Sequence, residues 1–216
     1  MARSTRLAPL VLALPLVLPF AGVGAAWADG SANANLSPVP LNGSQGSGTA
    51  MVTVEGTSID FTLAASGLAD GPHAAHIHFG ADARHECPTA ADETDGDDRL
   101  STTEGGPAYG PVVVSLTRTG DTSPKSTLAV ERFASGSEIE YMRGGVEVEQ
   151  GVADAVEQGQ AVVVVHGVAY EGARAQAKSD LNPALPAAAT DPAVCGVLSS
   201  APSGGAATGA GGTAAT

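Results

Sequence analysis

The sequence is poor in lysine, in aromatic residues and in cysteine. Lys125 and Lys178 are the only lysines, and lysine and arginine together number 10 against 23 acidic residues, for a formal net charge of -13. So acidic a chain is poorly suited to bind nucleic acid or an anionic membrane surface, and its charge favours cations instead. We therefore expect no nucleic-acid partner and look for a cation site.

Beyond its first 28 residues the sequence has no apolar stretch long enough to cross a bilayer. Within those residues, Arg3 and Arg6 precede an apolar segment, residues 7–23, which several prolines interrupt. The sequence AWA at residues 26–28 then fits a small-x-small cleavage site. We predict a secretory signal peptide over residues 1–28. The mature protein is then expected outside the cell or in the cell envelope, without a transmembrane segment.

The two cysteines, Cys87 and Cys195, bear on the same question. In an oxidising compartment a disulfide between them is the default interpretation. It would close a loop of about 108 residues, worth about 4–5 kcal/mol in the chain-entropy model. A metal thiolate is the weaker alternative, because only His85 lies near a cysteine at a spacing suited to a metal site.

Alternation of apolar and polar residues predicts an all-β domain. Residues 50–55 and 58–65 alternate on either side of Gly56 and Thr57, which is typical of a β-hairpin. Further strands are predicted at residues 74–79, 112–117, 126–132, 138–149, 160–166 and 193–198. With seven or eight short strands and one helical turn at 152–157, the pattern indicates a β-sandwich.

The remaining segments lack regular periodicity. Residues 29–47, rich in Ser, Asn, Gly and Pro, are interpreted as a flexible arm or an edge strand. Residues 81–111 and 171–192 are interpreted as long loops. Residues 200–216 contain too few large apolar side chains to join a core and are predicted to be disordered. The folded domain is therefore predicted to span residues 48–199.

The segment GPHAAHIHFG, residues 71–80, is the strongest functional signal. In a strand, side chains two residues apart project from the same face, so His76 and His78 can both reach one metal ion. His166, at the end of the apolar run AVVVVHG, is the candidate third ligand. Three imidazoles suit copper or zinc and leave a coordination position open. The alternative is that His76 and His78 line a solvated strand face.

Several further residues have two interpretations each. His85 is either a fourth ligand or an exposed loop histidine, and His73 is expected to bind a backbone group beside the site. The acidic run at residues 92–98 is interpreted as a solvated loop rather than a calcium loop, because the full twelve-residue pattern is missing. Three tyrosines either line a pocket or fill the core: Tyr109, Tyr141 and Tyr170.

Taken in this order, the segments over residues 48–199 resemble copper/zinc superoxide dismutases. GPHAAHIHFG resembles that family's G-x-H-x-x-H-x-H-x-F-G segment, and VVVVHG resembles a strand that ends in another copper ligand. The resemblance implies a Greek-key β-sandwich or flattened barrel in which one copper ion is bound by His76, His78 and His166. It also implies that His73 is buried without binding the ion.

The C-terminal segment AVCGVLS resembles the family's last strand, which carries a disulfide cysteine. This implies the pairing of Cys87 with Cys195. Other positions depart from the family. Ala108 stands where the dismutases have a metal-bridging histidine, and no histidine lies between His85 and His166, so no zinc is expected at the family's zinc site. Pro192 replaces the arginine that attracts superoxide.

A second resemblance fits these losses better. Exported, actinobacterial-type proteins with a CHRD-type domain share HIHFG, GPVVVSL and VVHG, and a proline-rich segment like residues 179–196. We therefore hold two hypotheses. The chain is either a secreted, dismutase-like copper protein with weak or altered redox activity, its partners one copper ion and superoxide, or a non-enzymatic extracellular CHRD-type domain or metal store. The residue pattern leaves open whether the chain is an enzyme.

Overall fold

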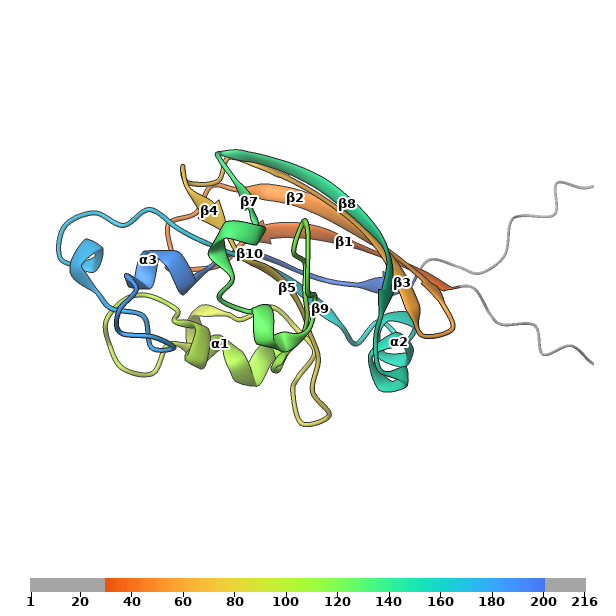
Figure 1. Ribbon diagram of the computed structural model, residues 1–216. Coiled ribbons are helices and arrows are strands. Elements are labelled where there is room, and N and C mark those ends of the chain that lie inside the picture. Colours follow the sequence, from red (N-terminus) through yellow and green to blue (C-terminus); the bar gives the residue numbers. More distant parts are fainter. Residues whose placement is uncertain (1–29, 201–216) are drawn as a thin grey trace, which may run out of the picture.

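The computed structural model describes residues 30–200 (Figure 1). The predicted signal peptide and the predicted disordered tail, apart from Ser200, lie outside the described residues. Within residues 30–200, no helix is long and apolar enough to span a membrane.

Nine strands form one antiparallel sheet, which curls into a flattened half-barrel (Figure 1). Along the sheet the order is β6-β5-β9-β10-β1-β2-β3-β8, with β11 also paired to β1. These strands are β1 (Gly30–Pro38), β2 (Ser47–Glu55), β3 (Ser58–Ser66), β5 (Ala75–His78), β6 (Val112–Ser115), β8 (Glu138–Glu147), β9 (Val162–His166), β10 (Pro192–Val197) and β11 (Ser199–Ser200). The predicted all-β class, with an antiparallel flattened barrel, is confirmed.

The remaining elements are short and lie around this sheet. Two of them, β4 and β7, pair with each other as a separate ribbon. They are β4 (Pro72–His73), β7 (Ala134–Ser135), α1 (Thr102–Tyr109), α2 (Gln150–Glu157), α3 (Ala187–Thr190) and the 3₁₀ turns η1 (Ala90–Asp92), η2 (Pro124–Ser126), η3 (Val130–Arg132) and η4 (Arg174–Gln176). Figure 1 shows α1 and the long connections gathered on one side of the sheet.

Strand β1 joins the two halves of the sheet and corrects the interpretation of residues 29–47 as a loose arm or an edge strand. It pairs with β2 from Gly30 to Leu36 and with β10 at Ser37 and Pro38. Its inward side chains, Ala32 among them, are buried. The sequence hides this strand because Ala, Ser, Asn and Gly have low strand propensity even where they alternate correctly.

Apolar side chains on the concave face of the sheet form the main core. The predicted hairpin of β2 and β3 is confirmed, and its larger inward side chains are buried at 2% exposure or less: Val52, Val54, Ile59, Phe61 and Leu63. Burial of this apolar surface, at about 25 cal/mol per Å², is the main favourable contribution to the stability of the sheet.

Strands β5 and β9 are buried on both faces. Val163 and Val165 of β9 belong to the main core, whereas Val162 and Val164 belong to a second cluster with Leu100 and Tyr109 and the Cys195 disulfide. This explains the run of four valines, because a strand covered on both sides needs apolar residues at successive positions. The cover on the outer face consists of loops, and the candidate site lies beneath it.

Two local predictions about this cover are wrong. Residues 126–132 form no strand; they run through η2 and η3, where Asp121 accepts hydrogen bonds from the hydroxyls of Ser123 and Ser126. Such side-chain bonds favour turns over strand pairing. The 81–111 loop contains a helix, α1, which begins with a reciprocal capping box between Ser101 and Glu104. The S-x-x-E pattern at these positions was its sequence signal.

Candidate metal centre

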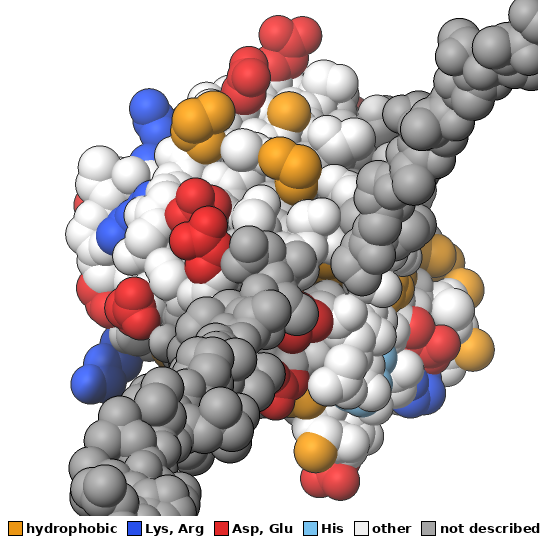
Figure 2. Space-filling view, turned by 90° about the vertical axis from the view of Figure 1, so that its right-hand side faces the viewer, with side chains coloured by type: hydrophobic (Ala, Val, Ile, Leu, Met, Phe, Trp, Pro, Cys, Tyr) orange, Lys and Arg blue, Asp and Glu red, His pale blue; other side chains and the backbone are white. Residues whose placement is uncertain are grey.

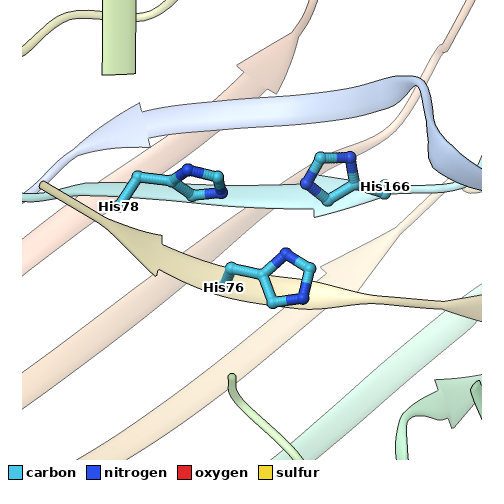
Figure 3. Close-up of side chains that lie close together, drawn as sticks. All are labelled: His76, His78 and His166. Carbon is cyan, nitrogen blue, oxygen red and sulfur yellow. The ribbon is translucent and has the colours of Figure 1, made fainter. Parts of the chain in front are cut away.

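Three histidine side chains meet on the outer face of β5 and β9 (Figure 3). His76 and His78 project from β5, and His166 ends the neighbouring strand β9. One ring nitrogen from each lies within 4.8 Å of one from each of the others. All three residues are buried, with exposed fractions of 3% or less. The predicted trio is therefore brought together by strand pairing, and it does not line a solvated face.

A backbone carbonyl holds each of the three rings. His78 donates its Nδ1–H to Gly110 over 2.8 Å, and His166 donates its Nδ1–H to Thr190 over 2.5 Å. His76 donates from Nε2 to Thr127 over 3.2 Å. A carbonyl oxygen only accepts hydrogen bonds, so each bond fixes the proton on the nitrogen that it contacts.

The other nitrogen of each ring therefore carries a lone pair. These atoms are Nδ1 of His76, Nε2 of His78 and Nε2 of His166, and each is buried without a hydrogen-bond partner among the described residues. Buried polar atoms are nearly always paired, so three orphans in one cluster require an explanation. Three convergent lone pairs on neutral imidazoles match what a copper or zinc ion takes as ligands.

Burial also keeps these rings neutral. Desolvation, helped by repulsion from His166, lowers the pKa of His78 to about 3. Desolvation likewise lowers the pKa of His166 to about 4, and that of His76 well below its ordinary value. The site therefore retains its lone pairs at neutral and mildly acidic pH, where free histidines begin to bind protons.

Two glycines and one further histidine support the ring positions. His73 lies behind β9, with its ring nitrogens 2.8 Å from the carbonyl oxygens of His166 and Ala69. Gly167 follows His166 at a φ of +104°, and a Cβ there would lie 2.7 Å from Nδ1 of His73. Gly110, whose carbonyl holds His78, has a φ of +86° and contacts the backbone of Gly80. Side chains at either glycine would displace the groups that orient the three histidine rings.

The trio forms the floor of a pocket of about 410 Å³. Its walls come from the covering loops, and they include Tyr109, whose ring meets the edge of His78 at 4.5 Å between centroids. Leu128 and Leu181, which are 39% and 45% exposed, also line it. Among the described residues that line the pocket, none carries an ionised acidic or basic side chain.

Two charged groups near the pocket, Arg99 and Asp191, pair with each other. Arg99 binds the buried carboxylate of Asp191 over 2.9 Å, and Tyr170 donates its hydroxyl to the same carboxylate. Burial raises the pKa of Asp191 to about 6 although Arg99 opposes this shift. Ala108 and Pro192 are both buried and do not line the pocket.

Cys87 and Cys195 form the predicted disulfide, with their Cα atoms 5.7 Å apart. The bond ties the 81–111 loop to β10 and lies in the outer cluster with Val162 and Val164. Because the same loop contributes Gly110 and Tyr109 to the site, the disulfide anchors one wall of the pocket to the sheet.

Comparison with known protein families gives a match over much of the described chain. The profile of the CHRD domain family matches residues 31–174, which is more than half of the chain. The chain belongs to the CHRD domain family. No curated protein matches this sequence.

The matched region of the CHRD domain contains all three histidines of the trio but stops short of residues 175–200. That last segment supplies the carbonyl of Thr190, the rim residue Leu181 and the disulfide cysteine Cys195. The strands that carry the three histidines thus lie inside the matched region, and part of the cover lies outside it.

The structure shows where the other candidate residues of this CHRD protein lie relative to the trio. His85 lies apart from the trio; its Nε2 is 2.9 Å from the carbonyl of Gly80, and its ring stacks on Phe79. Of the three tyrosines, Tyr109 lines the pocket and Tyr141 packs in the main core against Phe61.

The acidic segment of this CHRD protein pairs mainly with its own loop. Asp97 binds Arg99 over 2.6 Å, and Asp92 binds Arg84. The carboxylates of Glu93, Asp95 and Glu104 approach one another at the exposed surface of the same loop. They accept hydrogen bonds from backbone groups nearby, as Glu104 does from Thr94, which fits the solvated-loop interpretation.

Sequence reasoning missed the groups that orient the ligands. The three carbonyls belong to Gly110, Thr127 and Thr190, and a backbone carbonyl leaves no signature in residue type. The rim leucines were also missed, because Leu128 was assigned to a strand that does not form and Leu181 stands in a segment without periodicity.

Proposed function

We propose that this CHRD domain is an exported copper-binding protein with one three-histidine site. His76 would supply Nδ1, and His78 and His166 would each supply Nε2. The orphaned lone pairs carry this proposal, because nothing else in the described part of the chain accounts for three buried, convergent and unpaired ring nitrogens. Export is supported by the disulfide, since such bonds persist in oxidising compartments.

Copper is favoured over zinc by the donor set. For a given set of nitrogen ligands, divalent affinity peaks at Cu²⁺, and imidazole is a good ligand for both copper oxidation states. A bound copper ion would supply one-electron redox chemistry at the position left open by three ligands. The chain's own residues would hold the ion, fix the ligand tautomers and shield the site from bulk water.

We further propose that any reaction with superoxide is weak. Electrostatic steering of an anion requires positive potential at the mouth of the site. The pocket lacks a cationic side chain among its described lining residues. Figure 2 shows acidic side chains scattered over the face of the molecule in view, in line with the formal net charge of -13. A second candidate function, a copper store without enzymatic activity, is favoured by the same observation.

The test is a titration of the metal-free protein with Cu²⁺, followed by calorimetry and electron paramagnetic resonance. We expect one tight site with hyperfine coupling to nitrogen, and its loss in the His76→Ala/His78→Ala double variant. His85→Ala is the matched control, because it removes a histidine outside the trio. Excess Zn²⁺ should compete at the same site but more weakly.

The absence of tight copper binding by the folded wild-type protein would overturn the proposal. Equal copper affinity in the double variant would also overturn it, since the ion would then bind elsewhere. A superoxide assay on the copper-loaded protein separates the two candidates. With a chelator present to hold free copper, dismutation faster than that of the copper-treated His76→Ala/His78→Ala variant favours an enzyme, and equal rates favour a store.

A further inference from the structure

The pocket above the histidine trio is larger and more apolar than the binding of a metal ion alone requires. Its volume of about 410 Å³ falls within the range of about 300–1,000 Å³ that is typical of small-molecule sites. An apolar cavity of about 150 Å³ already admits benzene. The space over the trio therefore exceeds what a diatomic molecule or a water ligand needs.

The walls of this pocket are apolar and rather rigid. They include two prolines, one tyrosine ring and two leucines on the rim: Pro111, Pro124, Tyr109, Leu128 and Leu181. Burial of an apolar ligand surface against these walls is favourable, and a rigid ligand loses little conformational entropy on binding. An aromatic ring is both apolar and rigid.

The pocket also offers hydrogen-bond acceptors from two side-chain hydroxyls. Thr102 donates its hydroxyl proton to the carbonyl of Thr190 over 2.6 Å, and Thr127 donates its own to the carbonyl of Pro124 over 2.6 Å. Because each proton is already engaged, what the two oxygens offer a ligand is a lone pair. They fit a ligand that carries an O–H group.

Charge selects against ionic ligands. Among the described lining residues no lysine or arginine stands ready to pair with an anion, and no carboxylate with a cation. Burying an unpaired charge against apolar walls is costly. The chain's formal net charge of -13 also repels anions from a distance.

We propose that this pocket binds a neutral, one-ring aromatic alcohol, with its ring against the apolar walls and its O–H donated to Thr102 or Thr127. The inference names the ligand class of the same site, and it rests on the proposed function for the metal at the pocket floor. Phenol is the simplest probe, because it is neutral at pH 7, and benzoate is its negatively charged counterpart.

The test measures the binding of phenol and of benzoate by calorimetry and by NMR shift changes, first to the metal-free and then to the copper-loaded protein. We expect phenol to bind both forms, and benzoate to bind the metal-free form at least about tenfold more weakly. Leu128→Asp should weaken phenol binding at least about tenfold. Met142→Asp, which alters a 76% exposed residue of β8 outside the pocket, should leave it unchanged.

Three results would overturn the inference. The first is that benzoate binds the metal-free protein as tightly as phenol does. The second is that Leu128→Asp leaves phenol binding intact while near-ultraviolet circular dichroism shows a native fold. The third is that phenol fails to bind to protein that binds copper tightly. Phenol binding without copper binding would instead refute the metal proposal and retain the ligand class. The two failures are therefore distinguishable.

Discussion

The two faces of strands β5 and β9 are equally buried but differ in chemistry. The inner face carries Ala75, Ile77 and Val163, which fill the main core. The outer face carries the histidine trio and is covered by loops that a disulfide anchors. Apolar burial alone explains the inner face, whereas the outer face buries polar atoms that lack partners. A shared strand can therefore serve stability on one side and a site on the other.

Removal of the disulfide should produce the largest effect on stability. We expect the Cys87→Ser/Cys195→Ser variant to lose about 4 kcal/mol of unfolding free energy, because the bond closes a long loop of the unfolded chain. Urea denaturation measures this loss. An unchanged unfolding free energy would contradict the role of the bond as an anchor of the cover.

A cavity in the inner face comes next. Ile77 is fully buried, so Ile77→Ala should cost about 3 kcal/mol in the metal-free protein. The copper affinity of the protein that remains folded should change less than about threefold, since the side chain faces away from the trio. Met142→Ala, at an exposed position, is the control for stability. Loss of copper binding by folded Ile77→Ala protein would show that the two faces are not independent.

Acid should weaken the metal-free protein through the outer face. The lowered pKa values of His78 and His166, about 3 and about 4, mean that the unfolded chain binds more protons than the folded chain below pH 6.5. The unfolding free energy therefore falls as pH falls from about 6.5 towards about 4. Asp191, whose pKa is raised to about 6, acts in the opposite direction and offsets about one histidine.

Since three histidines outnumber one carboxyl group, the net result should be a loss of unfolding free energy between pH 6.5 and 4.5. Urea denaturation at a series of pH values measures it. The His76→Ala/His78→Ala variant should show a smaller pH dependence. A slope that the variant leaves unchanged would mean that other groups control the acid response.

The smallest effect is expected at His85. Its ring is occupied by the carbonyl of Gly80 and by stacking on Phe79, away from the trio. His85→Ala should leave copper affinity and the spectrum of bound copper unchanged, as measured by competition with a chelator. A weaker affinity and a shifted spectrum would make His85 the fourth ligand after all.

Sequence patterns predicted the strands and the trio because both depend on periodicity. Alternation in β2, β3 and β5 and the valine run of β9 indicated which residues face inward, and the same alternation placed His76 beside His78. Pairing of β5 with β9 then brought His166 to them.

The cover could not be predicted in the same way. Helix α1 had only a capping signal, and β1 consists largely of residues with low strand propensity. The carbonyls that fix the ligand tautomers depend on loop backbone conformation, which residue types do not specify. These features result from tertiary packing, so only the structure reveals them.

The tautomeric state of the three rings, measured by long-range proton–nitrogen NMR on the metal-free protein at pH 7, tests the metal centre most directly. We predict a proton on Nδ1 of His78 and His166 and on Nε2 of His76. On addition of Cu⁺, which is diamagnetic, the opposite nitrogen of each ring should shift. Mixed tautomers, or copper-induced shifts at the protonated nitrogens, would contradict the conclusion that three loop carbonyls prepare this face for a metal ion.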